Sequence, residues 1–272
     1  MREPIDKSQL TKKHRYRLGG AEYRAIDMLS KIVIIYYLSI IIIFGFLYRI
    51  YIAASGTAKD ILRSSNENGP VDPWFFSFFM SLSALNNLGL FLLDASMVPF
   101  QNEYAPLIFT IILILAGNTA YAIFLRFIIW CLYKMIPSSR VMLKETFQYL
   151  LDHPRRCYTT LFPSTQTWWL LAIIVVITLT ELISVLSLNY WLPALASLSW
   201  GSRIVDGLFQ SVATRNAGFS VLNLGELNPG TQLVYMVAMY ISVYPVAISM
   251  RNSNVYQVKG STIIATAKEV FD

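Results

Sequence analysis

Long, largely uncharged apolar segments restrict this chain to a membrane fold. The clearest covers residues 32–48, reads IVIIYYLSIIIIFGFLY, and lies between Lys31 and Arg49. A helix needs roughly 17–25 such residues to cross about 30 Å of hydrocarbon. Comparable segments cover residues 105–133, 168–188 and 231–250. With 55% hydrophobic and only 14% charged residues, these four predicted spans indicate an all-α integral membrane protein.

Two further apolar stretches, residues 74–85 and 204–213, are too short to cross a bilayer. Each leads directly into a segment that contains Asn and Gly, which are poor material for a membrane helix. Lipid cannot hydrogen-bond to irregular backbone, so a broken segment at membrane depth must be buried in protein or line a water-filled path. We therefore expect two re-entrant segments that mark an interior.

The net charge of +6 is distributed along the chain in a way that predicts membrane orientation. Basic residues concentrate before the first span, between the second and third, and after the fourth. By the positive-inside rule, these regions and both termini are cytoplasmic, and the loops with the short apolar stretches lie outside. No recognition motif accompanies the charge, so we expect lipid rather than nucleic acid as the partner of this surface.

The sequence offers little for enzymatic or cofactor chemistry. Cys131 and Cys157 both fall on the predicted cytoplasmic side, where thiols stay reduced. His14 and His153 are too few and too far apart in sequence to predict a zinc site. No nucleotide-binding motif and no hydrolase pattern is present. We expect no enzyme activity and no cofactor.

An internal repeat with few identical residues relates the two Asn/Gly segments at one offset of 129 residues (218 minus 89). Ala84, Asn87 and Gly89 fall opposite Ala213, Asn216 and Gly218. The order span, short helix, Asn-x-Gly, span also recurs, which predicts two copies of one unit and a binding site where they meet. The predicted divisions are a cytoplasmic basic segment, a first unit, a cytoplasmic loop, a second unit and a cytoplasmic tail, over 1–27, 28–133, 134–166, 167–250 and 251–272.

A short helix that ends at mid-membrane favours a cation there, because its C-terminal end carries about half a negative charge. An extended return strand can point successive carbonyl oxygens at one axis, where they replace the hydration shell of an ion. Gly89 and Gly218 suit such a strand because glycine accepts left-handed backbone angles. We expect the side chains of Asn87 and Asn216 to hold the loops from behind. The alternative is that these Gly and Asn residues serve ordinary helix packing.

Four polar residues are candidates for support of the loops or of an ion path. Arg126 either tunes the potential of the cytoplasmic half of the path or reaches the inner headgroups. Arg215 is expected to bind carbonyls or a carboxylate behind its loop, with Glu181 and Asp206 as competing partners. Asn118, within Gly117-Asn118-Thr119, either creates a kink or constriction or serves interhelical packing.

The segments SALNNLGL and SVATRNAGFSVLNLGELNP resemble the second and third pore loops of fungal Trk-type potassium transporters, in the Trk/Ktr/HKT superfamily. The resemblance extends to LGGAEYRAIDMLSKIV, GNTAYAIFLRFIIW, LLDHPRRCYTTLFP and YMVAMYISVYPVAISMRNSNVY, and so covers most of the chain. It implies M1–pore-loop–M2 units repeated four times around one selectivity filter. The filter residues implied here are Asn87, Leu88, Gly89, Leu90, Asn216, Ala217, Gly218 and Phe219.

In the resembling family, backbone carbonyls hold potassium, which implies that role for Asn87, Leu88, Gly89, Asn216, Ala217 and Gly218. Leu90 departs from the family, which more usually has Phe at this position. Only two of the four units are present, so we expect missing repeats of a parent chain, or a second copy, as partners. The expected function is potassium uptake across the plasma membrane, driven by the membrane potential. The alternative is a non-conducting fragment or a half-transporter that acts only in assembly.

Overall fold

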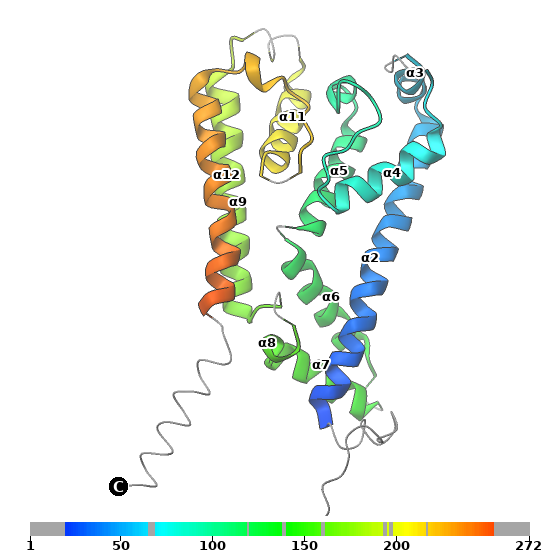
Figure 1. The fold of residues 1–272 in the computed structure, drawn as a ribbon, viewed down its shortest axis with the longest axis vertical. Helices are drawn as coiled ribbons and strands as arrows, with labels where there is room; N and C mark the ends of the chain where they lie inside the picture. Colours follow the sequence, from blue (N-terminus) through cyan, green and yellow to red (C-terminus); the bar gives the residue numbers. More distant parts are fainter. Residues whose placement is uncertain are drawn as a thin grey trace, which may run out of the picture. The chain divides into compact units, whose positions relative to one another are not determined.

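The computed structural model describes residues 20–64, 69–118, 120–137, 140–158, 161–192, 195, 198–215 and 217–252. At 20–22, 155–156 and 242–252 it describes the backbone only. Within these ranges the chain is helical and contains no strand, and its helices are apolar, which confirms the predicted all-α membrane class. Figure 1 shows the order of the helices along the chain.

The chain packs into two compact units that interleave in sequence. One comprises the described residues within 1–36, 122–167 and 248–272, and the other comprises residues 37–121 and 168–247. Both predicted pore loops belong to the second unit. This division reflects contacts between residues and not similarity between sequence segments. It does not test the predicted repeat boundaries, 28–133 and 167–250, which stay predictions.

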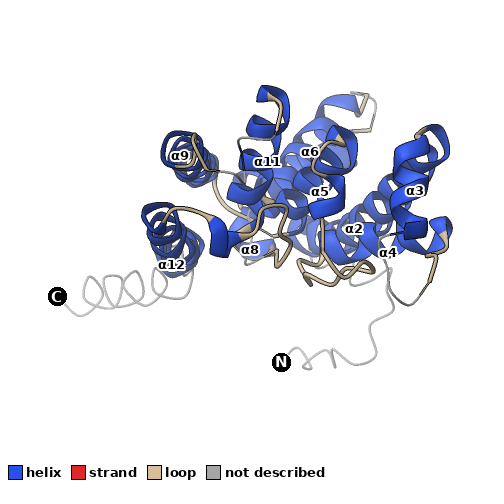
Figure 2. Cartoon of the chain, turned by 90° about the horizontal axis from the view of Figure 1, so that it is seen from above, coloured by secondary structure: helices blue, strands red, loops and turns tan. Residues whose placement is uncertain are grey.

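Three predicted spans coincide with long helices. α2 (Gly20–Ala54) covers the first, α9 (Ser164–Leu188) the third and α12 (Pro229–Asn252) the fourth. Among the residues searched, α2 and α9 are long and apolar enough to cross a membrane by themselves. α12 has 24 residues, a length that also suffices. In both views α9 and α12 lie side by side (Figures 1 and 2).

The second predicted span is not one continuous helix. α5 (Tyr104–Gly117) ends in its middle, and α6 (Tyr121–Met135) begins after Asn118, Thr119 and Ala120. The two helices together are apolar enough for one span, interrupted at this point. A Cβ at Gly117 would lie 1.7 Å from the carbonyl oxygen of Leu85, so α5 approaches the chain at Leu85 more closely than any side chain allows.

The two short apolar stretches form short helices, as expected. α4 (Pro73–Leu85) has 13 residues and α11 (Trp200–Ala213) has 14, which corresponds to about 20 Å at 1.5 Å per residue. Each begins with a side-chain cap: Asp72 accepts from the Phe75 amide at 2.9 Å, and Ser199 accepts from the Ser202 amide at 3.3 Å. Both helices pack against α5.

Connections complete the second unit. α3 (Gly56–Ser64) follows α2, and short 3-10 turns lie at Val98–Phe100 (η2) and Leu224–Glu226 (η3). Asn189, at the end of α9, donates to the Thr231 hydroxyl at 2.7 Å and accepts from the Asn228 amide at 2.7 Å. These two bonds fix the start of α12 to the end of α9.

The first unit contains most of α6 and the connection that follows it. α7 (Val141–Asp152) and α8 (Pro154–Cys157) show that the predicted cytoplasmic loop is partly helical. Cys131 and Cys157 are not joined by a disulfide. Arg24 forms an ion pair with Glu145 at 3.9 Å.

Candidate ion-selectivity site

The two Asn/Gly loops meet backbone to backbone. A Cβ built on Gly89 would lie 2.8 Å from the Cα of Gly218 and 3.0 Å from the carbonyl oxygen of Ala217. A Cβ built on Gly218 would lie 2.8 Å from the Cα of Gly89. Real Cβ atoms do not approach backbone this closely, so both positions require glycine. The internal repeat thus relates two residues that are in contact.

The backbone at these positions is left-handed. Gly89 has a φ of 67° and Gly218 a φ of 72°. Asn87 also has a positive φ, 51°, and Asn is one of the few other residues that tolerate this region. Asn216 lies outside the described residues. After these left-handed residues the chain leaves the end of each short helix. We call the segment that follows its return strand, although it forms no β-sheet.

The first loop is tied to the helix that precedes it. The Leu88 amide donates to the Ser83 carbonyl at 3.0 Å, which closes the last turn of α4. The Ser83 hydroxyl donates to the Leu90 carbonyl at 2.7 Å. The Leu90 oxygen is therefore already bound to the protein. The Leu88 and Leu90 side chains are 54% and 56% exposed.

The second loop is held by a buried glutamine. Gln210, on α11, is 1% exposed, and its Oε1 accepts from the amides of Val221 and Leu222 at 3.2 and 3.4 Å. The Ala217 amide donates to the Ala213 carbonyl at 3.1 Å. Ala217 and Phe219 are buried, in contrast to Leu88 and Leu90. The return strand of this loop therefore packs against protein over most of its length.

Among the described residues, three hydrogen bonds join one loop region to the other. The Met97 amide donates to the Ser220 carbonyl at 3.1 Å, and the Ser220 amide donates to the Ser96 hydroxyl at 3.3 Å. Gln101 Nε2 donates to the Val221 carbonyl at 2.6 Å. The segment after the first loop thus fixes the return strand of the second.

Two backbones in contact leave no room for an ion between Gly89 and Gly218. Any ion bound by both loops would therefore have to lie beside this contact. Backbone carbonyl oxygens in general suit a weakly hydrated monovalent cation. No group of three or more His, Cys, Asp or Glu side chains that could bind a metal occurs among the described residues.

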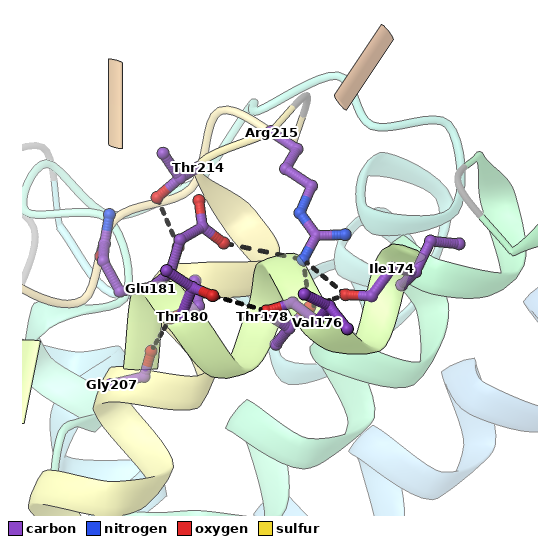
Figure 3. A network of polar contacts seen from close by, with 10 residues as sticks. Ile174, Val176, Thr178, Thr180, Glu181, Gly207, Thr214 and Arg215 are labelled. Atoms are coloured by element: carbon purple, nitrogen blue, oxygen red, sulfur yellow. Dashed lines mark hydrogen bonds and ion pairs between the residues drawn. The ribbon is translucent and has the colours of Figure 1, made fainter. Parts of the chain in front are cut away.

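Arg215 anchors the second loop to α9 (Figure 3). Its guanidinium donates to the Thr178 hydroxyl and to the Ile174 carbonyl, the latter at 3.3 Å. It also lies 3.6 Å from the carboxylate of Glu181. The side chains of Arg215 and Glu181 are 2% and 0% exposed, so this ion pair is completely enclosed. The sequence offers a carboxylate as one possible partner of Arg215, and in the structure Arg215 pairs with that of Glu181.

Asp206 does not pair with Arg215. Its side chain on α11 is 0% exposed, and both carboxylate oxygens lack a hydrogen-bond partner among the described residues. The sequence leaves Glu181 and Asp206 open as alternatives, and the structure selects Glu181. The reason is geometric, because Glu181 lies on α9, the helix that Arg215 reaches.

The remaining two candidates are not part of the loop contact. Arg126 belongs to the first unit and donates from Nη1 to the Phe162 carbonyl at 2.5 Å, which connects α6 to the segment before α9. Asn118 caps the C-terminal end of α5, and its backbone amide donates to the Ile114 carbonyl at 3.3 Å. In this structure Arg126 and Asn118 stabilise chain connections.

The sequence patterns do not single out four side chains that bond to the loop backbones: Ser83, Ser96, Gln101 and Gln210. A signal exists for Gln210, because a long polar side chain in an otherwise apolar short helix, one turn before the loop, needs a buried partner. Ser96 and Gln101 carry no such signal, since they lie in an ordinary polar connection.

Two short helices that each end in a left-handed glycine loop, set among membrane-length helices, define a pore-loop membrane protein. The chain matches the TrkH family, described as a cation transport protein, over residues 6–271, and it belongs to that family. The chain is therefore a multi-pass membrane protein of a transporter family and not an enzyme.

Fungal potassium transporters are among its relatives. The chain is 42% identical over 248 residues to the high-affinity potassium transport protein of Saccharomyces cerevisiae. The aligned region covers 91% of this chain and 20% of that protein. It is 42% identical over 250 residues to the potassium transporter TRK1 of Candida albicans, covering 92% and 23%. For potassium transport protein 1 of Schizosaccharomyces pombe the identity is 38%, covering 94% and 30%. The chain thus spans only a fifth to a third of these relatives.

Proposed function

We propose that this chain contributes two of the pore loops of a potassium uptake protein. The observation that carries the proposal is the contact of Gly89 with Gly218, two glycines that the repeat and the family resemblance assign to one filter. Potassium is proposed as the ion because the fungal relatives are named as potassium transporters. Backbone carbonyls at Asn87, Leu88, Gly89, Asn216, Ala217 and Gly218 are the proposed ligands of the transported potassium.

The driving force in this proposal is the membrane potential. An inside-negative potential provides about 2.3 kcal/mol per charge for each 100 mV, which corresponds to roughly fifty-fold accumulation of a monovalent cation. The proposed location is the plasma membrane of a fungal cell, with both termini cytoplasmic, on the basis of the relatives and of the basic segments at the inner ends of the spans.

Two loops that touch cannot surround an ion, so the filter needs further loops. The proposed partners are the remaining repeats of a longer parent chain or a second copy of this chain. The small share of each relative that the chain covers supports the first of these.

A chimaera tests the proposed function. This chain would replace the matching segment of the Saccharomyces cerevisiae relative, and rubidium uptake would be measured in cells that lack their own potassium uptake. We expect uptake with a preference for potassium over sodium, and we expect Gly218→Ser to weaken that preference. A folded chimaera that reaches the plasma membrane but takes up no rubidium would refute the proposal.

Liposomes that contain only the purified chain separate the two kinds of partner. Rubidium uptake that is abolished by Gly89→Arg with Gly218→Arg would indicate that copies of the chain assemble a pore. Absence of uptake from folded protein would assign the other loops to a parent chain.

A further inference from the structure

The C-terminal half of α6 carries a stripe of aromatic side chains. Phe127, Trp130 and Tyr133 follow at intervals of three residues, so they share one face of the helix. The rings of Phe127 and Trp130 stack with their centroids 6.1 Å apart. Phe127 is 58% exposed and Trp130 is 47% exposed, so the described part of the chain leaves this face open. Aromatic residues at the end of a membrane helix are typical of the interface between hydrocarbon and water.

Two lysines from different helices lie beside the end of this aromatic stripe. Lys134 on α6 places its Nζ atom 5.3 Å from the centroid of the Trp130 ring. Lys144 on α7 places its Nζ atom 5.9 Å from the centroid of the Tyr133 ring. Both distances lie within the range of a cation–π interaction. Because the two rings are one helical turn apart, α6 and α7 bring two positive charges to neighbouring rings.

The two ammonium groups are not neutralised by the protein. Among the residues that the structure describes, neither ammonium forms an ion pair or a hydrogen bond. Glu145 follows Lys144 in the sequence, but its carboxylate pairs with Arg24 at 3.9 Å. A lysine ammonium has three N–H donors, and an aromatic face does not cancel its charge. Both groups therefore remain free to bind an anion from outside the chain.

Exposed apolar side chains surround the same turn. Met135 at the end of α6 is 78% exposed, and Val141 and Met142 at the start of α7 are 60% and 61% exposed. The opposite face of α7 packs against protein through Phe147 and Leu150, which are buried. Apolar side chains in a basic segment gain stability when they enter the boundary between headgroups and acyl chains. This surface thus combines free positive charge with an apolar face.

We propose that the end of α6 and the start of α7 bind an anionic phospholipid. The phosphate lies between the ammonium groups of Lys134 and Lys144, and an acyl chain follows the aromatic stripe. The proposal rests on the proposed orientation, which places this end of α6 at the cytoplasmic leaflet, where anionic lipids occur. It does not require that the chain transport potassium.

Native mass spectrometry of the purified full chain in detergent tests the proposal. Phosphatidylserine or phosphatidylcholine would be titrated into the protein, and the fraction with bound lipid measured. We expect phosphatidylserine to bind more tightly. Lys134→Gln with Lys144→Gln should weaken that binding about thirtyfold, since each lysine near an anionic surface accounts for about a fivefold gain. Lys134→Arg with Lys144→Arg keeps both charges and should retain most of the binding.

Lys59→Gln with Arg63→Gln is the matched control, because it removes two exposed positive charges one helical turn apart on α3. We expect the control to bind phosphatidylserine as the unaltered chain does. Equal losses in the two glutamine pairs would reduce the effect to general charge attraction and overturn the proposal. Equal affinity of the unaltered chain for the two lipids would overturn it as well, without any variant.

Inorganic phosphate separates a lipid site from a site for free phosphate. We expect millimolar phosphate to displace little phosphatidylserine, because phosphate has no acyl chain to contact the aromatic stripe. Trp130→Ala should weaken the binding of phosphatidylserine several-fold, while its Tm shows that the protein remains folded. Complete displacement by phosphate, or unchanged lipid binding in folded Trp130→Ala, would contradict a phospholipid site at this surface.

Discussion

Gly89 and Gly218 touch through their backbones, so that a Cβ on either would lie 2.8 Å from the Cα of the other. The two residues lie in the two segments that the predicted repeat relates, and both adopt left-handed φ angles. Contact of equivalent positions is what a shared site at a repeat interface requires. The contact also explains why glycine is needed twice, once for each backbone.

Substitution of either glycine by alanine is predicted to separate the loops. The left-handed backbone disfavours a side chain by about 1–2 kcal/mol, and the close contact adds to that penalty. In the chimaera described above, we expect the potassium preference of Gly218→Ala to fall by about tenfold, equivalent to ~1.4 kcal/mol. Ratios of rubidium to sodium uptake provide the measurement.

Gly225→Ala is the matched control for this prediction, because its Cβ would meet only the Asn223 side chain at an ordinary 3.5 Å. Equal effects of Gly218→Ala and Gly225→Ala would argue against the filter assignment.

Gly117→Ala is predicted to disturb the packing of α5 against the end of α4. The added Cβ would lie 1.7 Å from the Leu85 carbonyl oxygen, which is backbone and cannot rotate away. We expect a loss of about 1–3 kcal/mol or more of stability, measured by thermal unfolding in detergent. Gly56→Ala meets nothing within 4 Å and should leave the Tm unchanged or slightly higher. A neutral Gly117→Ala would contradict the close contact.

Removal of one partner from the buried ion pair is predicted to be severe. Arg215→Gln or Glu181→Gln leaves one enclosed charge uncompensated, which typically destabilises by about 3–5 kcal/mol. The double variant should be more stable than the sum of the two single effects indicates. The yield of folded protein and the Tm provide the measurements.

The control for the ion pair is Glu145→Gln, which breaks the pair of Glu145 with Arg24. The Glu145 side chain is 59% exposed. We expect an effect below about 1 kcal/mol there. Comparable losses at Glu181 and Glu145 would show that the Arg215 pair is not enclosed.

Gln210→Met is predicted to loosen the return strand of the second loop. Methionine has a similar length but offers no amide oxygen, so the Val221 and Leu222 amides lose their acceptor at a cost of about 1–3 kcal/mol. Hydrogen exchange at these two amides should accelerate markedly.

Gln232→Met provides the comparison for Gln210→Met, because Gln232 is only partly buried and bonds to the turn at Leu224 and Leu227. It should leave exchange at Val221 and Leu222 unaltered. If exchange at the Val221 and Leu222 amides stayed slow in Gln210→Met, Gln210 would not be what holds the second loop.

Features set by local sequence could be predicted. The length of apolar segments gives the long helices, and segments too short to cross give α4 and α11, which begin at Pro73 and Trp200 after capping residues. The coincidence of Asn87 and Gly89 with Asn216 and Gly218 predicts that the loops are related. The contact between Arg215 and an acidic residue also follows, because an arginine buried in a membrane needs a partner.

Features set by contacts between distant segments could not be predicted. The sequence offers a kink at residues 117–119 as one alternative, but the close approach of Gly117 to Leu85 is a contact between distant segments. The choice of Glu181 over Asp206 depends on which helix Arg215 reaches. The bond that Ser96 accepts and the bond that Gln101 donates depend on how the two loop regions dock.

The contact between the loops is the central claim, and a cysteine cross-link tests it most directly. Cys131 and Cys157 would be replaced by serine, and Ser96→Cys would be combined with Ser220→Cys, where the Ser96 hydroxyl lies 3.3 Å from the Ser220 amide. Oxidation should produce a disulfide within one chain, detected as faster migration on a denaturing gel and by mass spectrometry. Ser96→Cys with Ser187→Cys is the control pair. An intramolecular disulfide formed at Ser96 and Ser220 but not in the control is the predicted result. If folded protein formed none, or only disulfides between chains, the two loops would not meet and the account would be contradicted.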